Sequence, residues 1–289
     1  MPLSAEQLTD PTYAFETGSV FVHSLGIEFD PVDQPDAYAE ALRKDDPRTA
    51  ENLIRYQLEK STQKLSPEAQ AVLDDTVLAL GMLEPVYPLP PEGRYGTMVV
   101  IGGARDALLD RSMFAANSIV QGVATNNLLL AGDPGRRLND EEKDVTRQWA
   151  PIAQTEYDLA RAATQRIRDE YPKVFGGMHG VSLAAFKLHT IKPDQRDVIN
   201  EVILRAEALA AATISDVGKL AVVTTAIYVP FKTHDTLSAT KRHGIAVDIA
   251  GVASRPEVIA RRTPATYVTD TLRTLVAAAH HQATIRRLG

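Results

Sequence analysis

Residues 97–106, Thr-Met-Val-Val-Ile-Gly-Gly-Ala-Arg-Asp, combine a glycine turn with a charged side chain in a way that could bind an anion. The apolar run Met98–Ile101 ends at Gly102 and Gly103, and a helical pattern follows at once. Glycine lets a backbone approach a ligand closely, and the free N–H groups of a helix N-terminus attract negative charge. The stretch matches neither the dinucleotide fingerprint nor the P-loop. We expect a small-molecule site here, and a plain strand-to-helix turn is the alternative.

Arg105 and Glu156 are the charged residues with the clearest chemical roles. Arg105 stands at a helix N-terminus, where its charge opposes the macrodipole. It could bind a phosphate or carboxylate with two hydrogen bonds, or it could pair with Asp106 or Asp110. Glu156 and Asp158 lie near the start of a later helix. A carboxylate there could hold a ribose hydroxyl or act as a base, and a solvated helix face is the alternative.

Further polar residues follow other predicted strands and would reach the same edge of a parallel sheet. The first pair, Gly132 and Asp133, opens a turn whose Asp-Pro-Gly sequence also needs no ligand to explain it. The second pair, Thr224 and Thr225, could supply hydroxyl groups, although β-propensity explains Thr224 nearly as well. Thr190 ends another predicted strand. We interpret these residues as candidate ligand contacts.

Several kinds of chemistry are excluded by what the chain lacks. There is no cysteine, which removes disulfides, thiolate nucleophiles and cysteine-ligated zinc. The seven histidines show no spacing typical of metal ligands, so no metal site is expected. No Gly-x-Ser-x-Gly sequence is present, which argues against an α/β-hydrolase.

Composition indicates an ordinary globular protein. The chain has 289 residues, of which 44% are hydrophobic and 24% charged, and its net charge is −6. An acidic chain without a basic cluster is not expected to bind nucleic acid. No segment approaches the roughly 20 apolar residues that span a bilayer, and the N-terminus does not resemble a signal peptide. We therefore expect a cytoplasmic protein without membrane insertion.

Strand-like and helix-like segments alternate along the chain, which predicts an α/β fold with a doubly wound, mostly parallel, Rossmann-like sheet. The first two predicted strands are short apolar runs that end at glycine turns, the fourth is strongly apolar, and the third alternates in character. The predicted strands are Met98–Ile101, Asn127–Ala131, part of Val181–Thr190, Leu220–Thr224 and Ile245–Ile249.

An N-terminal helical segment is expected to accompany this sheet. Residues 1–33 are predicted to be irregular, and residues 35–84 to form two or three helices that pack on the sheet domain. A helix is expected to begin at Pro151, because an interior proline breaks the hydrogen-bond ladder. Further helices are predicted over residues 194–214, 231–243 and 265–287. The predicted domains are residues 1–91 and residues 92–289.

Four blocks in this order resemble the SanA/YdcF/ElyC family of Rossmann-like proteins. They are Val-Val-Ile-Gly-Gly-Ala (99–104), Leu-Leu-Leu-Ala-Gly (128–132), Thr-Glu-Tyr-Asp-Leu-Ala (155–160) and Leu-Ala-Val-Val-Thr-Thr-Ala-Ile-Tyr-Val-Pro-Phe-Lys (220–232). The resemblance covers about residues 97–250. Asn200 and Glu201 stand in reversed order where the family has a Glu-Asn pair, and Tyr228 and Lys232 stand in place of its histidine and arginine.

The resemblance implies a nucleotide-like ligand, such as S-adenosylmethionine or a sugar or nucleotide phosphate. It also implies that Glu156 matches the family's glutamate and that Asn200, Glu201 and Lys232 lie near the ligand. Two function classes follow. One is an enzyme, a transferase or hydrolase that acts on or with such a ligand. The other is a non-catalytic ligand-binding or partner-docking protein linked to envelope metabolism. The expected partners are a small molecule and, in a homo-oligomer, a second copy of the chain.

Overall fold

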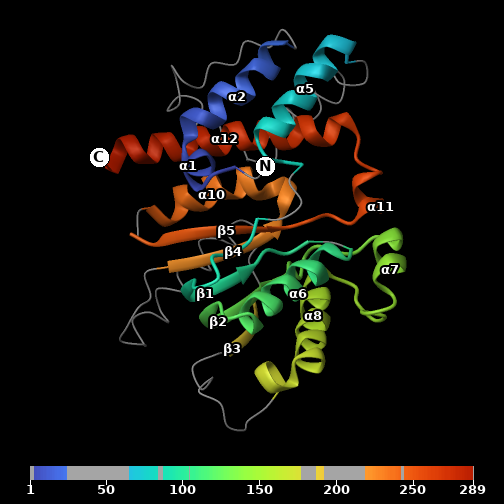
Figure 1. Ribbon diagram of the computed structural model, residues 1–289. Helices are drawn as coiled ribbons and strands as arrows, with labels where there is room; N and C mark the ends of the chain where they lie inside the picture. Colours follow the sequence, from blue (N-terminus) through green and yellow to red (C-terminus); the bar gives the residue numbers. More distant parts are fainter. Residues whose placement is uncertain are drawn as a thin grey trace. The chain divides into compact units, whose positions relative to one another are not determined.

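The computed structural model describes residues 3–24, 65–83, 87–103, 105–176, 187–191, 219–241 and 244–288 (Figure 1). The chain divides into two compact units. The first unit contains Met1–Val86, Ala226–His243 and Ala253–Gly289, and the second contains Tyr87–Thr225 and Gly244–Val252. The predicted helix over residues 194–214 lies outside the described residues.

A five-stranded, wholly parallel sheet forms the second unit. The strand order is β3-β2-β1-β4-β5, so the chain winds outward in both directions from the β1–β4 pair. This confirms the doubly wound, Rossmann-like α/β fold, and all five predicted strands are present. Their bounds are β1 Arg94–Val100, β2 Ala124–Ala131, β3 Lys187–Ile191, β4 Lys219–Thr225 and β5 Ala246–Val252.

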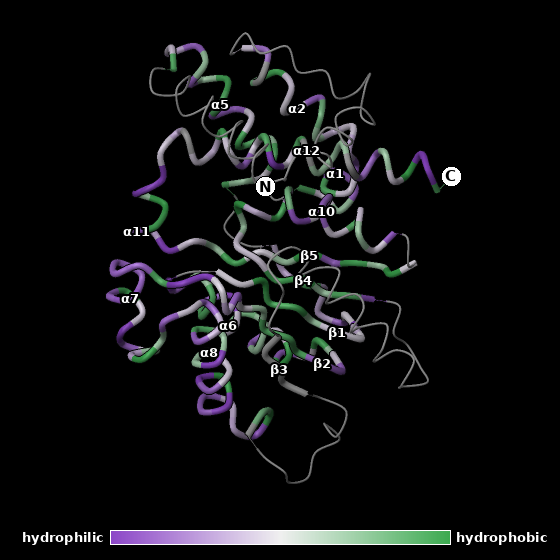
Figure 2. The backbone as a smooth tube through the Cα atoms, turned by 180° about the vertical axis from the view of Figure 1, so that it is seen from behind, coloured by the Kyte–Doolittle hydropathy of each residue, from purple (hydrophilic) through white to green (hydrophobic). Residues whose placement is uncertain are grey.

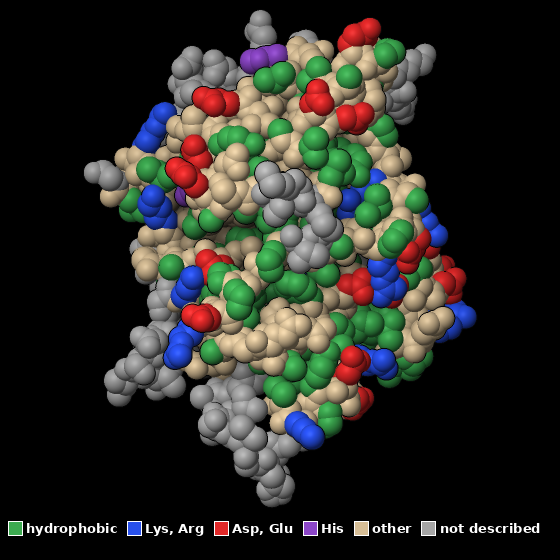
Figure 3. All heavy atoms as spheres, in the orientation of Figure 1, with side chains coloured by type: hydrophobic (Ala, Val, Ile, Leu, Met, Phe, Trp, Pro, Cys, Tyr) green, Lys and Arg blue, Asp and Glu red, His purple; other side chains and the backbone are tan. Residues whose placement is uncertain are grey.

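The helices of the second unit are α6 (Ala107–Val120), α7 (Asp140–Thr146) and α8 (Glu156–Glu170), followed by the short π-helix η1 (Pro172–Gly176). Alternate residues of β1, β2 and β4 pack against α6 and α8 in one apolar core. The residues between them form a second apolar cluster, because alternate side chains of a strand point to opposite faces. Figure 2 shows that α7 is mainly hydrophilic, and Figure 3 shows acidic and basic side chains mixed on the surface over it.

The predicted helix start at Pro151 is wrong. Helix α8 begins at Glu156, because Thr155 and Asp158 form a reciprocal capping box. The Thr155 hydroxyl accepts a hydrogen bond from the Asp158 N–H at 3.2 Å, and Asp158 accepts one from the Thr155 N–H at 3.0 Å. These bonds satisfy helix-end donors that a start at Pro151 would leave without such a cap.

Tyr95, Lys219 and Asp248 form a polar network near the amino ends of β1, β4 and β5. The Tyr95 hydroxyl donates to Asp248 at 2.6 Å, and the Lys219 ammonium lies 2.6 Å from the same carboxylate oxygen. Burial raises the pKa of Tyr95 above its usual value, and its hydrogen bond to Asp248 acts in the same direction. This network stabilises the edge of the sheet opposite to the strands' carboxyl ends.

The first unit is helical in its described part. It contains α1 (Ala5–Thr9), α2 (Pro11–Ser24), α5 (Pro67–Ala79), the 3-10 turn η2 (Ala226–Tyr228), α10 (Val229–Thr240), α11 (Pro256–Ile259) and α12 (Pro264–Leu288). Phe15, Phe21, Leu73 and Leu275 are fully buried in its core, which joins α2, α5 and α12. The prediction that residues 1–33 are irregular is wrong for α1 and α2, because Ser4 and Gln7 cap α1 and Pro11 begins α2.

The chain divides differently from the predicted boundary at residue 91. Helices α10 and α12, which the prediction assigned to the sheet domain, belong to the first unit. The reason is the apolar side of α12, where Val268 and Leu275 are buried with residues of α2 and α5. Residues 25–64, most of the predicted helical segment, lie outside the described residues. Ser66 caps helix α5, because its hydroxyl accepts a hydrogen bond from the Ala69 N–H. The predicted packing of residues 35–84 on the sheet stays a prediction.

Two buried histidines join α10 and α12 within the first unit. The Nδ1 atoms of His234 and His281 lie 3.2 Å apart, which is a hydrogen-bond distance when one ring carries the proton. Burial lowers the pKa of His234 to about 3 and that of His281 to about 4. Asp10 acts weakly against both shifts, and Lys241 adds to that of His281. The pair is therefore neutral near pH 7.

Candidate functional site

The carboxyl ends of β1, β2 and β4 meet at one edge of the second unit. The strand order reverses between β1 and β4, and ligands of open α/β sheets bind at such a switch point. The Ile101 N–H donates to the Val223 carbonyl at 3.0 Å, which keeps β1 and β4 together up to this edge. Gly102 follows β1, Gly132 follows β2, and Thr225 ends β4.

Arg111 of α6 links the ends of β1 and β4. Its side chain is buried, and the residue is only 4% exposed. The Nε and Nη2 atoms donate to the Thr225 hydroxyl at 2.9 and 2.7 Å. The Nη1 atom donates to the carbonyls of Ile101 at 2.9 Å and Gly102 at 2.5 Å. The buried guanidinium is thus surrounded by acceptors at the point where the strand order reverses. Its hydrogen bonds fix the geometry of the ends of β1 and β4.

Glu156, the first residue of α8, links the ends of β1 and β2. A Cβ placed on Gly102 would lie 2.5 Å from Glu156 Oε1, so the carboxylate packs directly against Gly102. Burial raises the pKa of Glu156, and the nearby Arg136 guanidinium, the backbone N–H of Asp133 and Arg111 oppose that rise. A carboxyl group with a raised pKa is better suited to exchange protons than an exposed glutamate.

The glycines at this edge make room for protein groups. A Cβ on Gly102 would also lie 2.8 Å from the Ala131 carbonyl oxygen, and one on Gly103 would lie 2.9 Å from Arg111 Nη1. A Cβ on Gly132 would lie 2.8 Å from both the Glu156 carbonyl oxygen and the Tyr157 Cα. The three glycines therefore admit Arg111 and the first turn of α8, which explains the glycine turns without a ligand.

Asp158, the second candidate carboxylate of α8, has a structural role. Burial acts to raise its pKa, but the N–H groups of Gln154 and Thr155 and the Thr155 hydroxyl outweigh it, so the pKa of Asp158 is lowered. A carboxylate that accepts these hydrogen bonds is held ionised as a helix cap. Glu156 and Asp158 are two residues apart, yet only Glu156 faces the strand ends.

Arg105 and Asp133 flank the two carboxyl-end turns. Arg105 has a φ of 60°, in the left-handed region, and its guanidinium pairs with Glu141 of α7 at 2.9 Å. The sequence had offered Asp106 or Asp110 as its partner. Asp133 accepts a hydrogen bond from the Gly135 N–H at 2.7 Å, as the turn interpretation predicted. Both residues lie near the site, but their charges are engaged with protein groups.

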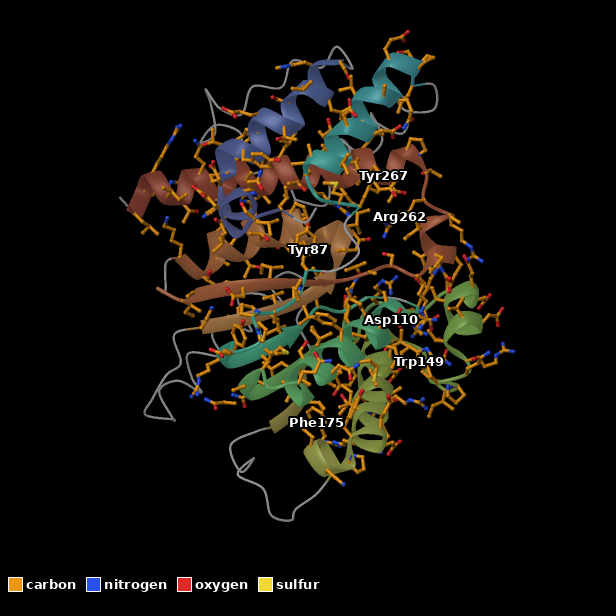
Figure 4. The ribbon with its side chains drawn as sticks, viewed as in Figure 1. Tyr87, Asp110, Trp149, Phe175, Arg262 and Tyr267 are labelled. Atoms are coloured by element: carbon orange, nitrogen blue, oxygen red, sulfur yellow. The ribbon has the colours of Figure 1, made fainter. Side chains whose placement is uncertain are left out.

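Residues 133–155 form the connection between β2 and α8. The two ends of this connection pair through the antiparallel bridge of Arg137 with Thr155. The Trp149 side chain, labelled in Figure 4, donates from Nε1 to Asp106 at 2.9 Å and so attaches the connection to the start of α6. Together with the Arg105–Glu141 ion pair, this contact holds α7 beside the carboxyl ends of the strands.

The remaining candidates are placed differently. Thr224 is buried on the opposite face of β4 from Thr225, by strand alternation, and its hydroxyl has no hydrogen-bond partner in the described part of the chain. Thr190 pairs with Leu130 near the end of β3. Lys232 belongs to α10 of the first unit and pairs with Asp235 at 2.9 Å. Asn200 and Glu201 lie outside the described residues.

Arg111 is the site residue that the sequence analysis missed. A signal for it was present, because Arg111 interrupts the apolar positions Leu108 and Ala115 at helical spacing. A charged residue on the buried face of a helix requires buried partners. The glycine turn that ends β1 supplies two of them, and Thr225 supplies the third.

In the part of the chain that the structure describes, no group of three or more histidine, aspartate or glutamate side chains is arranged to hold a metal ion. None of the helices found there combines the length and the apolar character that crossing a bilayer requires.

Comparison of the chain with protein-family models, with curated proteins and with solved structures found no match. The resemblance to the SanA/YdcF/ElyC family therefore stays a prediction.

Proposed function

We propose that the second unit binds a small, nucleotide-like molecule that carries a phosphate or carboxylate group, at the carboxyl ends of β1, β2 and β4. The ligand classes are those that the family resemblance implies, S-adenosylmethionine or a sugar or nucleotide phosphate. The observation that carries the proposal is the pair of buried charges, Arg111 and Glu156, on either side of the Gly102–Gly103 turn. Burying a charge costs free energy, and a carboxyl group whose pKa is raised by burial, as that of Glu156 is, is typical of functional sites.

In this proposal the two sides of the turn have different roles. Glu156 offers a carboxylate for the hydroxyl groups of a ribose, and its raised pKa suits it to act as a general base. The Arg111–Thr225 pair provides the polar contact for an anionic group. An S-adenosylmethionine-like ligand would supply an electrophilic methyl group when bound, while the chain's own residues bind and orient it. The enzyme class is thus a transferase or hydrolase, and the protein works in the cytoplasm, where such metabolites occur.

The second candidate function is a non-catalytic ligand-binding or partner-docking protein, linked to envelope metabolism. The observation in its favour is Lys232, which stands where the resembled family has an arginine. Its ammonium group is paired with Asp235 and is thereby partly neutralised. A homo-oligomer is compatible with both functions.

A ligand screen with purified full-length protein tests the proposal. The melting temperature is measured with ADP, S-adenosylmethionine, UDP-N-acetylglucosamine and inorganic phosphate, and binding is confirmed by calorimetry. We expect at least one of the first three to bind and raise the melting temperature, because a ligand that binds only the folded state stabilises it. No binding at millimolar concentration would refute the proposed function.

Two glutamate variants separate the enzyme from the binding protein. Glu156→Gln keeps the shape of the side chain and removes its basicity. Glu170→Gln, at the other end of α8, is the matched control, because it changes an exposed ion pair with Arg166 and a contact with Tyr171 and leaves the strand ends untouched. If the protein is an enzyme, mass spectrometry shows turnover of the bound ligand by the unmodified chain and by Glu170→Gln but not by Glu156→Gln. Binding without turnover by the unmodified chain favours the second function.

A further inference from the structure

Thr225 has an unusual hydrogen-bonding state. A threonine hydroxyl has two acceptor lone pairs and one donor proton. Arg111 donates to this oxygen twice, from Nε at 2.9 Å and from Nη2 at 2.7 Å, so both lone pairs are used. The hydroxyl proton must then point away from the guanidinium. Thr225 can act only as a donor for as long as Arg111 stays in place.

No protein acceptor takes this proton within the described residues. The hydrogen bonds found for the Thr225 side chain are those received from Arg111, and the residue is 5% exposed. A buried donor without an acceptor costs free energy, which an incoming acceptor would recover. The hydroxyl lies at the carboxyl end of β4, beside the Gly102 carbonyl that shares the same guanidinium. This is the position at which the fold class binds ligands.

We propose that Arg111 fixes Thr225 as an obligate hydrogen-bond donor, which favours a charged acceptor of the ligand, a phosphate or a carboxylate oxygen. Thr225 is the residue that touches the ligand, and Arg111 is its positioning residue. The inference rests on the proposed function, because it assigns the ligand contact of the same site. It also predicts that a ligand ammonium group is disfavoured at this point, because it has no acceptor lone pair and its protons would face the proton of Thr225.

The threonine variants that test this differ by one group each. Thr225→Val keeps the shape and removes the hydroxyl, and Thr225→Ser keeps the hydroxyl. Thr97→Val is the matched control, because Thr97 is also a buried threonine of a central strand and its hydroxyl has no hydrogen-bond partner within the described residues. If Thr225→Val does not fold, Thr225→Cys takes its place, since a thiol is a weak donor of similar size.

Calorimetry with two ligand pairs gives the readout. ADP is compared with adenosine, which lacks the phosphates, and S-adenosylmethionine with 5′-methylthioadenosine, which lacks the carboxylate. We expect Thr225→Val to weaken binding of ADP, if the acceptor is a phosphate, or of S-adenosylmethionine, if it is a carboxylate, by roughly 10- to 100-fold. Binding of the truncated partner is expected to change by less than about 3-fold, and Thr225→Ser and Thr97→Val are expected to bind like the unmodified chain.

The outcomes separate the inference from the proposed function. If ADP or S-adenosylmethionine binds the unmodified chain and Thr225→Val equally well, the inference fails and the proposed function stands. If Thr225→Val weakens the full ligand and its truncated partner by the same factor, the effect is structural and the inference also fails. If neither ADP nor S-adenosylmethionine binds the unmodified chain, the inference and these two ligands fall together.

Discussion

Replacing Arg111 by methionine is the sharpest test of how the switch point is held together. Methionine preserves the length and apolar stem of the side chain and removes every donor. Three acceptors then lose a partner, namely the carbonyls of Ile101 and Gly102 and the hydroxyl of Thr225. An unsatisfied buried polar group costs about 1–3 kcal/mol. With partial relaxation, we expect a loss of about 3–5 kcal/mol, as for a broken buried charge network. That is a large share of the roughly 5–15 kcal/mol that stabilises a typical protein.

Urea unfolding followed by tryptophan fluorescence measures this loss of unfolding free energy in the second unit of the chain, to which Arg111 belongs. Trp149 is the chain's single tryptophan, and its Nε1 donates to Asp106 at 2.9 Å within the second unit. Its emission therefore reports the unfolding of the sheet. Arg147→Met is the control, because Arg147 is 73% exposed in its side chain and pairs only with Asp144 among the described residues. Such a surface ion pair contributes about 0–1 kcal/mol.

The loss of unfolding free energy in Arg111→Met is compared with the loss in Arg147→Met. Arg111→Lys is expected to fall between the unmodified chain and Arg111→Met, because an ammonium keeps the charge but cannot reach both strand ends as the guanidinium fork does. If Arg111→Met costs no more than Arg147→Met, Arg111 does not hold β1 and β4 together, and the reasoning is refuted.

Three further predictions concern other parts of the two units. Gly132→Ala is expected to destabilise the second unit by roughly 2 kcal/mol or more, because its Cβ would meet the backbone of α8 at 2.8 Å. Gly244→Ala, whose Cβ has open space around it, is expected to cost only about 1 kcal/mol for its φ of 65°. Equal urea midpoints for the two variants would contradict the packing argument. The His234–His281 pair predicts a pH dependence. Its folded pKa values of about 3 and about 4 lie below the usual 6.5, so the unfolded chain binds more protons, and stability falls as the pH falls from about 6.5 to 4. The unfolding free energy is expected to change by about 1.4 kcal/mol per pH unit for each proton, which urea unfolding followed by circular dichroism measures at several pH values. An unchanged slope in His281→Gln would exclude the histidine pair as its source. Glu156→Gln is expected to leave stability at pH 7 unchanged or higher, because burial raises the pKa of Glu156 and its charge is therefore costly at that pH. A clear fall in its melting temperature would show that the charge is needed for folding.

The sheet could be predicted from the sequence because each strand carries a signal of its own. Strands buried on both faces are continuous apolar runs, as in Leu128–Ala131 and Leu220–Val223, and a glycine turn ends the first of these. Helices α1 and α2 were missed, because residues 1–33 were predicted to be irregular, whereas Pro11 begins a helix. A proline can interrupt a helix or occupy its first position, and the capping residues around it decide between the two.

The candidate site was predicted less completely than the sheet. Glu156 was found through its place at a helix start, and the glycine turns through the abrupt ends of two apolar runs. Arg111 was missed because its partners, Thr225 and the carbonyls of Ile101 and Gly102, lie 9 to 114 positions away in the sequence. A side chain that binds backbone carbonyls leaves no residue-type signal at its partners. Only the parallel pairing of β1 with β4 brings these groups together.

Amide chemical-shift mapping tests the central claim, a small-molecule site at the switch point, most directly. The ¹⁵N-labelled full-length protein is titrated with ADP and, separately, with S-adenosylmethionine. The account predicts saturable shift changes with at least one of them, largest at the amides of Gly102, Gly103 and Gly132, which surround the buried charges of Arg111 and Glu156. Shift changes confined to other parts of the chain, or no change with either molecule, would contradict it.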